Sequence, residues 1–178
     1  MEELQQWKQR MREERPVEWD SFPDLGLYMD QVLSYMPRQL LDLGETGALT
    51  SAMINNYIKE GLLPRAEGKK YSRTHLAYLT AICALKQVIS VKDVHLLLSQ
   101  GEALTEDEAG RPDVRRLYEA FRRELGQALN ETADSLPEAC SRDQLVRVAL
   151  GLALRSYADR LACQRMLAIL SQPDRPEP

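Results

Sequence analysis

The sequence has few of the features that mark a secreted, membrane-bound or disulfide-stabilised protein. It holds three cysteines among 178 residues, and no two of them form a Cys-x-x-Cys pair. An odd number of widely separated cysteines argues against a disulfide framework and favours a reducing, cytoplasmic compartment. No run of about 18 apolar residues is present, so we expect no transmembrane helix. The charged N-terminus lacks the apolar stretch of a secretory signal, so we expect no such signal.

Motifs for catalysis and for metal binding are also missing. The sequence contains no Gly-x-Ser-x-Gly, no phosphate-binding loop, no Gly-x-Gly-x-x-Gly and no His-Glu-x-x-His. The two histidines, His75 and His95, have no acid or thiol at ligand spacing, and His75 is interpreted as a surface or capping residue. Cys140 and Cys163 lack the companions of a zinc site and are interpreted as buried structural thiols. We therefore predict no enzyme, no cofactor and no metal.

The composition is that of a folded protein, with 44% apolar and 28% charged residues. Apolar residues at helical spacing, bounded by Gly, Pro and capping residues, predict an all-α fold. The expected helices cover residues 2–14, 25–36, 51–60, 73–87, 91–99, 112–129 and 142–170. The last of these is apolar on more than one face, which leaves three alternatives: the core of a bundle, a dimer interface, or the wall of a small-molecule pocket.

The polar, acidic segment 100–111 is the predicted boundary between two parts of the chain. We divide the sequence into an N-terminal helix and linker (1–19), a main unit (20–100), a helical regulatory or dimerisation region (112–171) and a disordered tail (172–178). Within the main unit, the short segment 62–71 contains Pro64 and Gly68 and is predicted to form a small two-stranded hairpin.

The positive charge of the chain is concentrated in the main unit. Residues 50–75 hold five cations, Lys59, Arg65, Lys69, Lys70 and Arg73, against two glutamates, so this segment has a net charge of +3. The whole chain has a net charge of −4, which leaves −7 for the rest. A basic patch on an acidic body is suited to meeting phosphate while limiting non-specific binding.

The main unit contains the motifs TSAMINNYIKEGLLP (50–64), KKYS (69–72) and SVKDV (90–94). Together they resemble the DNA-binding domain of MerR-type (mercury-resistance) regulators. With LYMDQV (27–32), the stretches MINNYIKEGLLP and KKYSRTHLAYL are also similar to an uncharacterised bacterial family, labelled a domain of unknown function, over about residues 20–100. The resemblance implies a winged helix-turn-helix with the hairpin as wing, and a bacterial transcription regulator that binds double-stranded DNA.

The sequence departs from the MerR pattern in two ways. Asn55 stands where the family usually has an arginine; asparagine can read adenine in the major groove, so the exchange is chemically workable. The long heptad helix that pairs two MerR-type chains does not follow the main unit directly. We still expect a homodimer, because two half-sites on DNA need two recognition helices.

The resemblance assigns DNA contacts to the helix 51–60 and to the segment after it. The candidate residues are Thr50, Ser51, Asn55, Asn56, Lys59, Arg65, Lys69, Lys70, Tyr71 and Arg73. The helix would enter the major groove, and the wing would clamp the flanking phosphates. In the alternative interpretation, Thr50 and Ser51 only cap the helix, the asparagines are solvated and Tyr71 is core. The rival function is a protein-interaction module that keeps the winged-helix fold and does not bind DNA.

Overall fold

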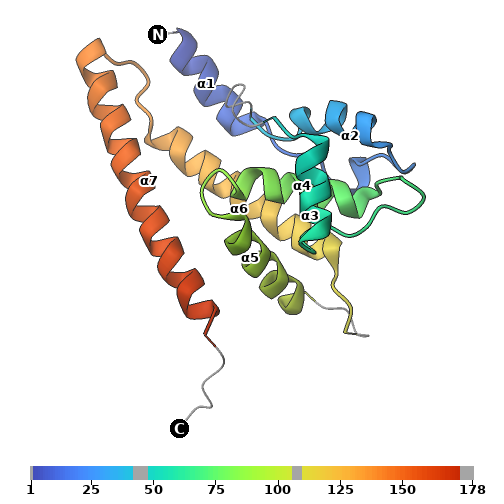
Figure 1. Ribbon diagram of the computed structural model, residues 1–178. Coiled ribbons are helices and arrows are strands. Elements are labelled where there is room, and N and C mark those ends of the chain that lie inside the picture. Colours follow the sequence, from blue (N-terminus) through green and yellow to red (C-terminus); the bar gives the residue numbers. More distant parts are fainter. Residues whose placement is uncertain (1, 42–47, 106–109, 173–178) are drawn as a thin grey trace.

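The computed structural model describes residues 2–41, 48–105 and 110–172. These residues form seven α-helices and two short 3-10 turns (Figure 1). The helices are α1 (Glu2–Glu13), α2 (Met29–Tyr35), α3 (Ser51–Lys59), α4 (Arg73–Leu85), α5 (Val91–Leu104), α6 (Val114–Ser135) and α7 (Arg142–Leu170), and the turns are η1 (Trp19–Ser21) and η2 (Met36–Arg38). The predicted all-α class is confirmed. Most of the predicted tail (173–178) and part of the predicted boundary segment (106–109) lie outside the described residues.

Local capping chemistry sets where the helices begin. The hydroxyl of Thr50 accepts the backbone N–H of Met53 at the start of α3, and Ser90 accepts that of Asp93 at the start of α5. Ser141 opens α7 in the same way. Each cap satisfies one backbone N–H that the first turn of a helix leaves without a partner. No described helix is long and apolar enough to cross a membrane.

Helix α4 is the centre of the core. Every residue from His75 to Cys83 is buried, which is unusual for one helix and requires neighbours on all sides. Those neighbours include buried side chains from other elements: Phe22, Val32 of α2, Ile54 of α3, Val94 of α5 and Tyr118 of α6. One continuous apolar cluster therefore joins α2, α3, α5 and α6 around α4.

Helix α5 runs five residues beyond the predicted end at residue 99. The polar stretch after Leu98 stays helical through Leu104, and Gly101 in this stretch lies against Leu117 of α6. A Cβ built on Gly101 would lie 2.8 Å from the Cδ1 of Leu117, so the glycine allows a close approach of the two helices. The sequence pattern alone does not predict the contact between Gly101 and Leu117.

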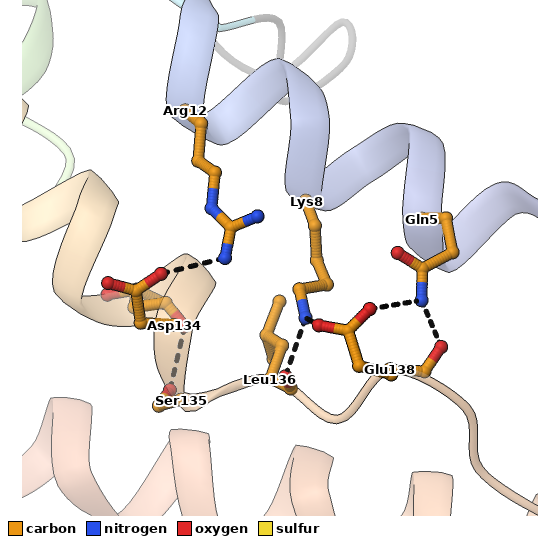
Figure 2. A network of polar contacts seen from close by, with 8 residues as sticks. Gln5, Lys8, Arg12, Asp134, Ser135, Leu136 and Glu138 are labelled. Carbon is orange, nitrogen blue, oxygen red and sulfur yellow. Dashed lines mark hydrogen bonds and ion pairs between the residues drawn. The ribbon is translucent and has the colours of Figure 1, made fainter.

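A polar clasp ties α1 to the segment that joins α6 and α7 (Figure 2). The ammonium of Lys8 donates to the backbone carbonyl of Leu136 at 2.9 Å and pairs with the carboxylate of Glu138 at 2.6 Å. The Lys8 side chain is only 3% exposed. Arg12 adds an ion pair with Asp134 at 2.8 Å. The N-terminal helix is thus held on its own chain, at the place where α7 begins.

Helix α7 lies at the edge of the molecule (Figure 1). It contacts the body through Val148 and Leu152 near one end and through Cys163 and Leu167 near the other. The prediction of buried thiols was too strong for two cysteines: Cys163 is half-buried because α7 packs on one side only, and Cys140 is half-buried in the preceding linker.

Candidate nucleic-acid interface

Helix α3 has one buried and one open face. Ile54 and Tyr57 are buried against the α4 core. Ser51, Asn55 and Lys59, one helical turn apart, lie on the exposed side, with Asn56 beside them. The i, i+4, i+8 spacing of the first three makes this a single polar strip along the helix.

In the turn that follows α3, the backbone N–H groups donate to carbonyl groups of α3 itself. Gly61, with φ of 74°, takes the left-handed conformation that suits a helix end. The N–H groups of Leu62 and Leu63 both donate to the carbonyl of Tyr57, at 2.8 and 3.1 Å. Pro64 has no N–H. These residues therefore cannot supply the first strand of a hairpin.

Only a tight turn remains where a two-stranded hairpin was predicted. Glu67 and Lys70 exchange two backbone hydrogen bonds of 3.1 and 2.9 Å as an isolated antiparallel bridge. Gly68 and Lys69 at its tip have φ of 56° and 66°, the pair of positive angles of a type I′ turn. The prediction of strands is wrong for the described part of this segment, because two paired residues are too few to make them. We call residues 64–70 the basic turn.

Tyr71 does not belong to the exposed surface. Its backbone pairs with Leu27 through hydrogen bonds of 2.9 and 2.8 Å, and its side chain is 5% exposed. The ring packs edge-on to the imidazole of His75, with centroids 5.4 Å apart. Burial raises the pKa of the Tyr71 phenol. Tyr71 is therefore a core residue, and its predicted contact with DNA is corrected.

His75 fastens the basic turn to α4. Its Nδ1 accepts the backbone N–H of Ser72 at 3.0 Å, and its Nε2 lies 3.2 Å from the carbonyl oxygen of Arg65. Nδ1 as acceptor and Nε2 as donor define the neutral imidazole. Burial holds the pKa of His75 below its ordinary value, partly offset by the hydrogen bond to the Arg65 carbonyl. Of the two alternatives for His75, surface or capping residue, the capping role is confirmed, and the side chain is buried.

The candidate cationic side chains differ in the contacts that they make within the protein. Arg73 donates to the carbonyl of Phe22 at 3.2 Å and forms an ion pair with Asp24. The ammonium of Lys70 lies over the ring of Tyr28, 5.4 Å from its centroid. Arg73 is thus largely committed to the fold, whereas Lys70 stays exposed.

The remaining candidate cations are exposed to solvent. Within the residues that the structure describes, Lys59, Arg65 and Lys69 are exposed and take part in no ion pair. They come from the end of α3 and from the basic turn that follows it. Ammonium and guanidinium groups that no carboxylate neutralises can bind anions such as phosphate.

We also searched the described residues for a metal site and for a ligand pocket. Among the described residues, no group of three or more His, Cys, Asp or Glu could hold a metal ion. The hollow between α4, α5 and α6 is apolar and has a volume of about 20 Å³, which is room for about one water molecule. That hollow is too small for an organic ligand, and no residue of α7 lines it.

Comparison with known proteins assigns the chain to a protein family. Searches of the curated proteins and of the solved structures each found no match. One family model, described as a domain of unknown function (DUF1836), matches residues 17–121, from the segment before η1 to the first turns of α6. That match covers more than half of the chain and leaves out α1 and α7. The chain therefore belongs to the DUF1836 family, a domain of unknown function.

Proposed function

We propose that this protein is a DNA-binding transcription regulator of the MerR-like, winged helix-turn-helix type. The observation that carries the proposal is the pairing of a polar, exposed strip on α3 with an exposed basic turn directly after it. In this arrangement α3 enters the major groove, and the basic turn takes the place of the wing. The tight turn at Glu67 to Lys70 is a minimal version of that wing.

The residues divide by the kind of contact they make. Asn55 and Asn56 carry amide groups that can hydrogen-bond to the N6 and N7 atoms of adenine. Lys59, Arg65, Lys69 and Lys70 contact phosphates, which fix position without reading sequence. Thr50 and Ser51 lie at the start of α3, where backbone N–H groups and the helix dipole favour an anion. Thr50 also caps α3, so its hydroxyl has a structural role in addition.

The rival function, protein binding without DNA, is favoured by the net charge of −4 and by Asn55 in place of arginine. The surface of α3 argues against it. Protein interfaces are centred on buried aromatic or aliphatic anchors. Among the described residues of α3, no large apolar side chain is exposed. A partner protein would find amides and one ammonium there, which suit a nucleic acid better.

Fluorescence anisotropy with a labelled random-sequence duplex tests the proposal. We expect binding that weakens roughly 100-fold between about 50 and about 200 mM salt if about four phosphates are contacted. The Lys69→Ala/Lys70→Ala variant removes two of these contacts, so it should weaken binding and lower the salt slope by about two. No binding at low salt would overturn the proposal and favour the protein partner.

A matched control separates local contacts from the total charge. Arg116 and Arg123 are exposed on α6 and lie outside the candidate surface. The Arg116→Ala/Arg123→Ala variant changes the net charge by the same two units. We expect its affinity to stay within about twofold of the wild type, since long-range attraction is screened over about 10 Å at moderate salt. Equal losses in both double variants would show that only net charge matters.

A further inference from the structure

One face of α7 is apolar and open to solvent. Its large side chains recur at i, i+4, i+8, i+11 and i+15, and each is between 49% and 64% exposed. They are Val146, Leu150, Leu154, Tyr157 and Leu161, and we call them the outer stripe. The helical period of 3.6 residues brings them onto one face. An exposed apolar patch of this kind marks an interaction site.

The body of the protein cannot cover the outer stripe. Helix α7 already contacts the body through Val148, Leu152, Cys163 and Leu167. At 100° per residue, the centre of that set lies roughly on the opposite side of the helix from the outer stripe. Turning the outer stripe inward would expose the residues that now hold α7 in place. A second molecule is needed to bury it.

The total surface, counted over all 178 residues, exceeds that of a compact monomer of the same mass. The chain exposes 12297 Å². A compact monomer of 20.3 kDa would expose about 8,800 Å². The excess of about 3,500 Å² is larger than the roughly 1,000 to 2,500 Å² that each subunit contributes to an obligate homodimer interface. The available area is thus sufficient for a permanent dimer.

We propose that the outer stripe is the interface between two copies of this chain. From Leu150 to Leu161 the large side chains are spaced 4, 3 and 4 residues apart. This order reads the same in both directions, so a reversed copy of the helix presents the same pattern. A two-fold interface requires such self-complementarity, and an unrelated partner does not.

The two α7 helices run antiparallel in this dimer. Leu150 then lies against Leu161 of the second copy, and Leu154 against Tyr157 of the second copy. Small residues flank this seam and allow close approach; a Cβ built on Gly151 has no atom within 4 Å in the single chain.

A parallel pair would bring like charges together. Arg147 lies three residues before Leu150, where the 4-3-4 repeat continues. In a parallel pair it would meet Arg147 of the second copy, and two guanidinium groups in one seam repel each other. In the antiparallel pair Arg147 lies next to Gln164 of the second copy, which is neutral.

Sedimentation velocity on the full chain, without DNA, tests the dimer from about 1 to about 100 µM. We expect a mass about twice the 20.3 kDa of the chain. Leu154→Glu should raise the dimer dissociation constant at least about 30-fold, because it places a charge in the centre of the interface. The control Ala162→Glu adds the same charge at an exposed position of α7 outside the outer stripe and should leave the dimer intact.

Circular dichroism verifies that each variant is folded, and Leu150→Gln replaces Leu154→Glu if the latter is not. A wild-type chain that stays monomeric throughout the range overturns the proposal. So does a folded Leu154→Glu or Leu150→Gln variant that dimerises as tightly as the wild type. Because no DNA is present, either result is independent of the DNA-binding proposal.

Disulfide cross-linking tests the antiparallel orientation. A mixture of the Leu150→Cys and Leu161→Cys variants should give more cross-linked dimer than either variant alone. The wild-type chain, with its three cysteines, sets the background. Efficient cross-linking of Leu150→Cys with itself would show a parallel pair and overturn the antiparallel assignment.

Discussion

His75 joins two parts of the candidate interface, since its Nδ1 accepts the N–H of Ser72 and its Nε2 lies 3.2 Å from the carbonyl oxygen of Arg65. Ser72 caps α4, and Arg65 belongs to the basic turn. The neutral imidazole is the form that makes both contacts. A second proton on the ring would remove the acceptor at Nδ1 and leave the Ser72 N–H without its partner. The contact that caps the start of α4 thus depends on the protonation state of one buried side chain, whereas Nε2 can donate to the Arg65 carbonyl in either form.

The first prediction concerns pH. Burial lowers the pKa of His75 in the folded state, so below about pH 6.5 the unfolded chain binds a proton that the folded chain does not. The stabilising contribution is fully present above that pH and is lost as the pH falls towards the lowered folded pKa. Urea unfolding at about pH 7.5 and about pH 5.5 measures the loss, which a single group limits to about 1.4 kcal/mol per pH unit.

His75→Gln provides the comparison for that experiment. Glutamine at this position keeps the capping box, because its amide oxygen can accept the Ser72 N–H, and it does not titrate. We expect the variant to lose less stability than the wild type over the same pH interval. Equal losses in the two proteins would show that the acid sensitivity comes from other groups.

The second prediction concerns the clasp between Lys8 and Glu138. Removing the carboxylate leaves a buried ammonium with the Leu136 carbonyl as its remaining partner, whereas replacing the lysine by methionine removes the charge together with its desolvation cost. Glu138→Ala should therefore lower the melting temperature more than Lys8→Met, in thermal unfolding followed by circular dichroism. The reverse order would mean that the ion pair itself outweighs the cost of burying Lys8.

The clasp has a pH dependence of its own. The hydrogen bonds from Lys8 and Gln5 hold the pKa of Glu138 below its ordinary value. Its contribution to stability is present above the unfolded pKa of about 4.3 and is lost as the pH falls towards the folded value. This window lies below that of His75, so the two groups can be separated by the pH at which stability declines.

The third prediction tests the corrected role of Tyr71. Because the ring is buried against His75 and the α4 core, Tyr71→Ala should lower the free energy of unfolding by about 3 to 5 kcal/mol. Tyr71→Phe keeps the ring and should leave DNA affinity within about twofold of the wild type, since a core residue contributes no phosphate contact. A large loss of DNA affinity in folded Tyr71→Phe would return Tyr71 to the contact surface.

Local signals were sufficient to predict most of the helices. The bounds of α7 follow from the Ser141 cap and from an uninterrupted helical sequence up to residue 170. The start of α3 follows from Thr50 in the same way. Where the prediction was wrong, one cause is a local hydrogen-bond pattern at the end of α3 and the other is a contact between two helices. The carbonyl of Tyr57 accepts the N–H groups of Leu62 and Leu63, which a hairpin would need for its own hydrogen bonds. Leu117 of α6 packs on Gly101, in the part of α5 that runs beyond the predicted end.

The candidate site could be predicted only in part. Residue type and helical period suffice to predict that Asn55 and Lys59 are exposed. The burial of Tyr71 depends on Leu27, which is 44 positions earlier in the chain and pairs with its backbone. The burial of Lys8 could not be predicted from the sequence. Its partners, Leu136 and Glu138, come close to it only because α1 packs on α6.

The fourth prediction separates charge from backbone strain at Lys69. With φ of 66°, Lys69 is the one non-glycine residue with positive φ that the described chain contains. The left-handed conformation costs roughly 1 to 2 kcal/mol for a residue with a side chain and little for glycine. Lys69→Gly and Lys69→Ala remove the same ammonium, but only the glycine variant also removes the strain.

We therefore expect Lys69→Gly to unfold at a higher denaturant concentration than Lys69→Ala, with a difference of about 1 kcal/mol in free energy, while both bind DNA equally weakly. Urea unfolding and anisotropy on the two variants measure these quantities side by side. If DNA affinity instead follows stability, so that Lys69→Gly binds more tightly than Lys69→Ala, the shape of the basic turn and not the Lys69 charge controls binding. In that case the phosphate contact assigned to Lys69 is wrong, although the surface that contains it is retained.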